Sequence, residues 1–140
     1  MIGKLDDYLR FNEAALSLRS QRQELIASNI ANADTPGYKA RDIDFASALQ
    51  GAMARTAAPA GALNTTAPAH IGGPAQNPDL LPDGTQVQYR PVVQGAADGN
   101  TVDMDVERNQ FADNAVRYEA GITMLNQQIR NMMAAIQGGT

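Results

Sequence analysis

The residue types that most often catalyse reactions or hold metals are scarce in this chain. The only histidine is His70, which lies among Ala, Pro and Gly residues where no rigid scaffold would hold it, so we interpret it as a solvated loop side chain. Cysteine is absent, which excludes thiol chemistry and thiolate ligands. The sequence also contains no HExxH, GxxxxGKS/T or GxGxxG motif. These observations predict no catalytic residues, no metal site, no cofactor and no small-molecule substrate, and therefore a protein that is not an enzyme.

Two acidic clusters remain as candidate ligands for a hard cation such as calcium. One is formed by Asp42 and Asp44, and the other by Asp103, Asp105 and Glu107. A calcium-binding EF-hand loop needs a particular pattern of ligands with a central Gly, and neither cluster has it. We interpret the second cluster as the start of a helix, where aspartates cap the chain and interact favourably with the helix dipole. Both clusters are then expected on solvated faces.

The overall composition excludes further classes of function. The net charge of −4 and the pI of about 4.8 argue against nucleic-acid binding, which normally needs a basic surface. No apolar segment resembles a cleavable signal peptide or reaches the roughly 18 residues of a membrane span. We therefore expect no membrane-spanning segment, and either a cytoplasmic protein or one exported without a signal peptide.

The first 33 residues, 1–33, predict a long amphipathic helix. They contain no Pro and a single Gly. With polar residues filling the gaps, an alternating spacing of four and three relates the apolar residues that we expect to pack, which are Leu5, Leu9, Leu16, Ile26 and Ile30. A second stripe runs beside the first and consists of Tyr8, Phe11, Ala15, Leu18 and Leu25. Because two stripes make a face too broad for one partner helix, we expect this helix to have more than one neighbour.

The last segment, 101–140, predicts a second helix with a heptad repeat. Its apolar positions are spaced 4,3,4,3,4,3,4 without exception, at Phe111, Ala115, Tyr118, Ile122, Leu125, Ile129, Met132 and Ile136. This pattern is typical of a coiled coil, and Gly138-Gly139 would end the helix. We predict a mainly α fold in which the two terminal helices pair as a coiled-coil-like bundle, with apolar surface left over for copies or relatives of the chain.

Between the helices we distinguish a connector, 34–50, and a flexible middle, 51–100. Residues 51–82 consist largely of Ala, Pro and Gly, and only Arg55 and Asp79 are charged. Such a segment has little apolar surface to offset the entropy lost on ordering. We expect at most a short strand in this part, within 85–94.

The connector begins with a turn that the sequence specifies closely. Pro36 lacks an amide donor and pushes the preceding residue out of the helical region, so the first helix must end by about Asp34. Pro36 and Gly37 at the central positions predict a type II turn, with Gly37 at positive φ. We expect Asn29 and Asn32 to hydrogen-bond carbonyls that the helix end leaves free, or to accept a left-handed conformation.

The stretch from Ser28 to Asp42, SNIANADTPGYKARD, resembles the amino-terminal signature of the bacterial flagellar rod and hook family, in which a helix ends in a string of the form ANxxTPGYK. The continuation to Phe45, the short chain and the residues Val102 to Asp105 before the second helix most resemble the small proximal rod members of that family. The resemblance covers roughly residues 1–50 and 98–137, and the Ala/Pro-rich segment between them is not covered.

The resemblance implies a structural subunit of the flagellar basal body rod, located in the periplasm. Members of the family assemble in a helical array through both terminal helices, which form the inner tube and its export channel, and they are exported without a cleaved signal peptide. The implied partners are other flagellar rod subunits, the rod-to-membrane-ring adaptor and the flagellar export gate. We expect an assembly motif that contacts a neighbouring subunit, made of Asn29, Asn32, Thr35, Pro36, Gly37, Tyr38, Lys39, Arg41 and Asp42.

A cytoplasmic coiled-coil adaptor or secretion chaperone is the alternative function. It shares the helices and the acidic pI but gives no role to residues 34–45. An adaptor of that kind would be a stable helical dimer in dilute solution, whereas a rod subunit would be a partly helical monomer.

Overall fold

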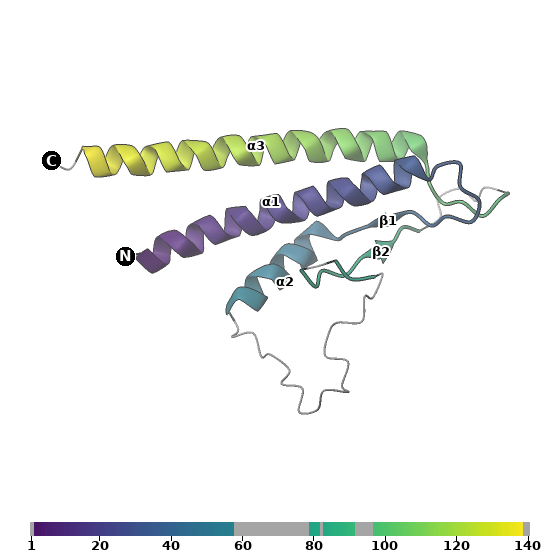
Figure 1. Cartoon of the computed structure of the whole chain (residues 1–140), viewed down its shortest axis with the longest axis horizontal. Coiled ribbons are helices and arrows are strands. Elements are labelled where there is room, and N and C mark those ends of the chain that lie inside the picture. The colour runs from purple at the N-terminus through teal and green to yellow at the C-terminus, as the bar shows by residue number, and fades with distance from the viewer. Residues whose placement is uncertain (1, 58–78, 82, 92–96, 139–140) are drawn as a thin grey trace, which may run out of the picture.

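The computed structural model describes residues 2–57, 79–81, 83–91 and 97–138, so most of the predicted flexible middle lies outside the described residues. The described part is mainly helical (Figure 1). Its elements in chain order are α1, Ile2–Ala31; β1, Arg41–Asp42; α2, Phe45–Ala57; β2, Gln88–Tyr89; and α3, Met104–Gln137. The predicted mainly α fold with long terminal helices that pack together is confirmed.

Helix α1 is the middle layer of the fold. It packs antiparallel to α3 on one side, and on the other side it contacts α2 and β1 (Figure 1). Both chain ends therefore lie at the same end of the α1–α3 pair, and the two strands lie toward the opposite end. The prediction that this helix has more than one neighbour is confirmed.

The turn after α1 has the predicted geometry. Just beyond the helix, the side-chain amide of Asn32 donates to the Ser28 carbonyl at 2.8 Å. Gly37 has φ +73°, and the Tyr38 amide donates to the Thr35 carbonyl at 3.3 Å across the turn. A positive φ at the third residue of the turn is the mark of type II, so the local sequence sets the direction in which the chain leaves the helix.

The ends of α3 also follow local rules. Asp103 is the N-cap, and its carboxylate accepts hydrogen bonds from the backbone amides of Asp105 at 3.0 Å and Val106 at 3.3 Å. Asp105 lies in the first turn, where the helix dipole favours negative charge. At the other end, Gly138 donates its backbone N–H to the Ala134 carbonyl at 2.8 Å. The predicted capping at both ends is confirmed.

The apolar core lies between α1, α2 and the strands. Leu18 and Leu25 of the second α1 stripe meet Ile43, Ala48 and Val87 there. Half-buried residues packed around this cluster are Phe45, Leu49, Ala52 and Leu81. Full burial of a leucine or isoleucine side chain stabilises a fold by roughly 1.5–3 kcal/mol, so this cluster anchors α2 and the strands on α1.

Helix α2 is not among the predicted elements. Its residues fall in the predicted connector and in the predicted flexible middle, and the prediction of flexibility is wrong for 51–57. The first proline after α2 is Pro59, and the Ala-rich residues before it have high helix propensity. Asp44 caps the helix, since its carboxylate accepts from the Ala46 amide at 3.1 Å and from the Ser47 hydroxyl at 2.6 Å.

The two strands form a short antiparallel sheet. β2 falls inside the predicted range 85–94 and pairs with β1 in the register Arg41↔Tyr89 and Asp42↔Gln88. Since Arg90 directly follows β2, this pairing brings it beside Asp42.

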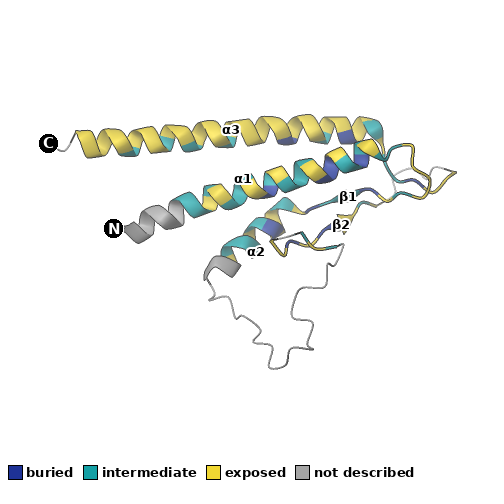
Figure 2. Ribbon diagram, in the orientation of Figure 1, coloured by how far each residue is buried: buried dark blue, intermediate teal, exposed yellow. Residues whose placement is uncertain are grey.

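The most buried residues of α3 lie on a face next to its predicted apolar stripe. The buried residues of α3 are Glu107 and Asn114, and along the same face Gly121 and Gln128 are half-buried. Leu125 and Met132 of the stripe are also half-buried, whereas its other large members are exposed (Figure 2), namely Phe111, Tyr118, Ile122, Ile129 and Ile136. Within one chain these five side chains therefore keep at least 37% of their surface exposed, and their packing between subunits stays a prediction.

On α1, the expected packing residues face inward to different degrees. Ile26 is buried, and Leu9, Leu16 and Ile30 are half-buried. The side chain of Leu5 lies outside the described part of the chain.

Candidate assembly site

The predicted assembly motif folds back onto its own helix. The side chain of Asn29 is buried, its Nδ2 donates to the Arg41 carbonyl at 2.8 Å, and its Oδ1 accepts from the Arg41 amide at 3.0 Å. The Tyr38 hydroxyl lies 3.4 Å from the same Oδ1 and 3.1 Å from the Ser28 hydroxyl. Asn29 thus bonds β1 as a neighbouring strand would. The expectation that it bonds the free carbonyls of α1 is wrong.

A distant residue bonds the carbonyls of the turn that follows α1. Asn100 is buried, and its Nδ2 donates to three carbonyls, those of Asn32 at 3.0 Å, Ala33 at 2.7 Å and Thr35 at 3.0 Å. These three carbonyls belong to the turn beyond Ala31, the last residue of α1. Asn100 therefore fixes the turn after α1 from a position just before α3.

Further hydrogen bonds join the same two segments, 35–40 and 98–101, which together we call the clasp. The Thr101 amide donates to the Tyr38 carbonyl at 3.0 Å, and the Thr101 hydroxyl accepts from the Ala40 amide at 2.8 Å. The clasp therefore links the direction in which α1 ends to the position where α3 begins.

Beside the clasp, four charged side chains form one hydrogen-bonded network. Arg22 donates to both carboxylate oxygens of Asp42, from Nε at 2.8 Å and from Nη2 at 2.9 Å. Arg90 bridges the two acids, with Nη2 2.9 Å from Asp42 and Nη1 2.6 Å from Glu107. Asn29 donates to the other oxygen of Glu107 at 3.2 Å. The network joins α1, β1, the segment after β2 and α3.

The network shifts the pKa values of its two acids in opposite directions. Burial raises the pKa of Asp42, but hydrogen bonds from Arg22 and Arg90 outweigh it, so the net pKa lies below the ordinary value of 3.8. Burial also raises the pKa of Glu107, and the Asn29 hydrogen bond and the Arg90 charge do not offset it, so the net pKa lies above 4.5. Since all four carboxylate oxygens accept hydrogen bonds, these acids hold the layers together rather than activate a substrate.

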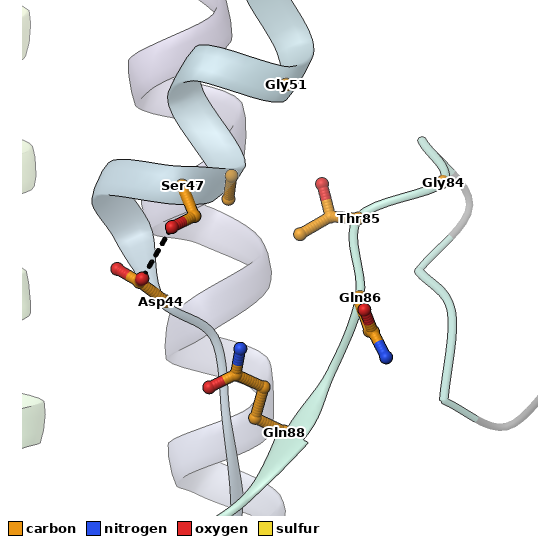
Figure 3. A pocket seen from close by; sticks show the side chains of 8 residues that line it. Asp44, Ser47, Gly51, Gly84, Thr85, Gln86 and Gln88 are labelled. Carbon is orange, nitrogen blue, oxygen red and sulfur yellow. Dashed lines mark hydrogen bonds between the residues drawn. The ribbon is translucent and has the colours of Figure 1, made fainter.

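The hollow in Figure 3 does not contain a catalytic arrangement either. It has a volume of about 250 Å³ and lies between the start of α2 and the segment 84–88. Its lining is mostly small and neutral, and its one acid, Asp44, is hydrogen-bonded to Ser47, which lowers the pKa of that acid. Asp44 acts here as the cap of α2.

The described residues also lack a metal-binding cluster and a membrane-spanning helix. Within these ranges, no group of His, Cys, Asp and Glu side chains is placed to hold a metal ion. No helix in the part of the chain that the structure describes combines the length and apolarity needed to cross a membrane.

The exposed part of the predicted motif is limited to its turn. Thr35, Pro36, Gly37 and Lys39 are exposed, and the Lys39 ammonium donates to the Gly99 carbonyl at 2.7 Å. The remaining motif residues are buried or half-buried, namely Asn29, Asn32, Tyr38, Arg41 and Asp42. Contact of the motif with a neighbouring subunit stays a prediction.

Sequence reasoning missed several residues that matter most to this site. The expectation of solvated faces is wrong for Asp42 and Glu107, and no role was predicted for Arg22, Arg90 or Asn100. Only Arg22 carries a usable signal, because it falls four residues from buried apolar positions on both sides and therefore on the apolar face of α1. A charge on such a face normally has a partner.

One further surface has the character of an interface. We define the α3 stripe as Phe111, Ala115, Tyr118, Ile122, Ile129 and Ile136, all of which are exposed. The large side chains of this line are between 37% and 77% exposed. Continuous exposed apolar surface of this kind marks sites of protein–protein contact.

Comparisons with known proteins agree with the resemblance in the signature. Residues 9–39 match a family model described as flagella basal body rod protein. The flagellar basal body rod protein FlgB of Escherichia coli (strain K12) is 53% identical over 141 residues, which cover 99% of each chain. The FlgB of Salmonella typhimurium is 52% identical over 141 residues with the same coverage, and that of Cereibacter sphaeroides is 45% identical over 134 residues, 94% of this chain and 95% of the relative. Similarity at this level over nearly the whole length shows that the chain belongs to the FlgB family of flagellar basal body rod proteins.

Proposed function

We propose that this chain is a structural subunit of the proximal rod of the bacterial flagellar basal body. It assembles with other rod subunits in a helical array through its terminal helices, and so helps to form the shaft and its export channel. Relatives that match over nearly the full length carry the name of rod proteins. The observation that carries the assembly proposal is the exposed α3 stripe.

The distribution of burial supports a role for neighbours in completing the helices. Among residues whose side chains are described, every buried one lies between Leu18 and Asn114. In the distal arms of α1 and α3 beyond these positions, none of the described side chains is buried (Figure 2). Covering the exposed part of one large stripe side chain would stabilise by roughly 1 kcal/mol, so burial of the stripe by a neighbour adds several kcal/mol to the assembled state.

The same proposal extends to location and partners. The rod-to-membrane-ring adaptor and the flagellar export gate are the proposed neighbours at the base of the rod, and other rod subunits are the neighbours beyond it. The chain would reach the periplasm by export without a cleaved signal peptide. The exposed turn of the motif, Thr35 to Gly37, is a second proposed contact.

The test is a charge placed on the stripe, with a matched charge placed elsewhere on α3. Ile122→Asp should abolish motility in cells that depend on the variant, because the carboxylate would be buried without a partner in the assembled rod. Val116 is 67% exposed and does not belong to the stripe, so Val116→Asp should leave swimming unchanged.

Swimming assays, export measurements and circular dichroism of the free variants separate assembly from folding. The proposal predicts normal export and helical content for both variants and loss of motility for Ile122→Asp alone. Normal motility of Ile122→Asp would contradict it. A stable dimer of the parent chain in dilute solution would instead favour the alternative of a coiled-coil adaptor.

A further inference from the structure

The interface between α1 and α3 is polar where it is most buried. Asn114, 1% exposed, donates from Nδ2 to the Arg19 carbonyl at 2.8 Å and to Gln23 Oε1 at 2.6 Å. Farther along the pair, Asn12 Nδ2 donates to Gln128 Oε1 at 3.1 Å. Amide side chains therefore make the contacts between the helices at positions where a coiled coil would place apolar residues.

A more apolar face of α3 lies close by and is only partly covered. Successive residues of an α-helix are about 100° apart, which places the α3 stripe about 70° around the helix from the face that carries Asn114 and Gln128. Leu125 and Met132 lie between the two faces and are half-buried. A turn of α3 about its own axis would bring the stripe onto α1. Burial of apolar surface alone would favour that arrangement.

The amide of Asn114 also carries a cost. Its Oδ1 is buried and has no hydrogen-bond partner among the described residues. A buried unpaired acceptor destabilises a fold. A residue retained for stability alone would therefore not be expected to bury an oxygen without a hydrogen-bond partner. Buried polar residues in helix interfaces are best known for selecting register and partner at the expense of stability.

The shape of the interface fits the same choice of face. Gly121 lies on the packed face, and a Cβ added there would come within 3.0 Å of Leu16 Cδ2. The absence of a side chain therefore allows a close approach of the two helices at this point. Gly121 itself contributes little apolar burial, because it has no side chain.

We infer that Asn114 and Gln128 are specificity-determining residues, whose amides select the face of α3 that packs on α1 and leave the α3 stripe free. The reason for keeping the stripe free rests on the proposed function. The choice of face does not, because it is a property of the single chain.

Cysteine cross-linking of the free chain in dilute solution tests the inference. The chain has no native cysteine, so each double variant contains two thiols only. Leu16→Cys with Gly121→Cys reports the observed face, and Leu16→Cys with Ile122→Cys reports the stripe face. Under mild oxidation the parent chain should form the first disulfide at least ten times faster than the second.

The same two reporters are then placed in an Asn114→Ala/Gln128→Ala background. The ratio of the two rates should fall at least tenfold, while Asn126→Ala, which removes an exposed amide of α3, should leave it unchanged. An unchanged ratio in the Asn114→Ala/Gln128→Ala chain would overturn the inference.

Circular dichroism of each variant completes the test. Retained helical signal together with a changed ratio supports face selection. Loss of the helical signal would mean that the amides hold the helices together rather than choose between faces, and would also overturn the inference. Motility is not read here, so failure of the proposed rod function and failure of this inference are distinguishable.

Discussion

Replacing Asp42 by Asn should destabilise the fold by about 2–3 kcal/mol. The substitution keeps the shape of the side chain but removes the charge that receives three hydrogen bonds from Arg22 and Arg90. Breaking a fully buried ion pair costs about 3–5 kcal/mol, and breaking an exposed one about 0–1 kcal/mol. These three side chains are 16–19% exposed and Glu107 still neutralises Arg90, so the expected cost lies between the two limits.

Asp113→Asn is the matched control for this experiment. It makes the same chemical change in a pair with Arg117 at 2.8 Å, where the side chains are 60% and 49% exposed. Its cost should be at most about 0.5 kcal/mol. Urea unfolding near neutral pH, followed by the helical circular dichroism signal, measures both free energies of unfolding. If Asp42→Asn were no more destabilising than Asp113→Asn, the claim that the charged network holds the layers together would be refuted.

Gly37→Ala, at φ +73°, should cost about 1 kcal/mol, whereas Gly51→Ala, in open space on α2, should stabilise by up to about 1 kcal/mol, as thermal melts would show. Asn100→Ala removes the donor to three carbonyls and should cost about 1–3 kcal/mol, with faster hydrogen exchange in 35–40 but not in α2. The stabilisation by Asp42 is fully present above pH 3.8 and is lost as the pH falls through the lowered pKa that Asp42 has in the folded chain. The stabilisation by Glu107 is fully present below pH 4.5 and is lost as the pH rises through the raised pKa that Glu107 has in the folded chain. Glu107→Gln should therefore make the free energy of unfolding depend less on pH between pH 4.5 and neutral pH, as urea titrations at several pH values would show.

The predicted features that the structure confirms depend on neighbours in the sequence. Pro36 and Gly37 specify the turn because the constraints on φ and hydrogen bonding act within four residues. Asp103 caps α3 by bonding amides two and three residues away. Helix α2 obeys the same kind of rule, with Asp44 as its cap. It was not predicted because the composition of 51–82 is dominated by the residues that follow Pro59.

The network and the clasp depend on contacts that no local pattern specifies. Asn29 reaches Glu107 across 78 residues, and Asn100 reaches the turn after α1 across 65 to 68 residues. The heptad pattern of α3 is present in the sequence, but it does not specify which helix packs on it. Within the chain, α1 packs mainly on the neighbouring polar face of α3.

The central claim is that a neighbouring subunit covers the α3 stripe. A map of the assembled basal body, resolved to side chains, tests this most directly. We predict that Ile122 and Ile129 lie within about 4 Å of apolar side chains of another subunit, the distance of van der Waals contact. A map in which both side chains face water would contradict the account.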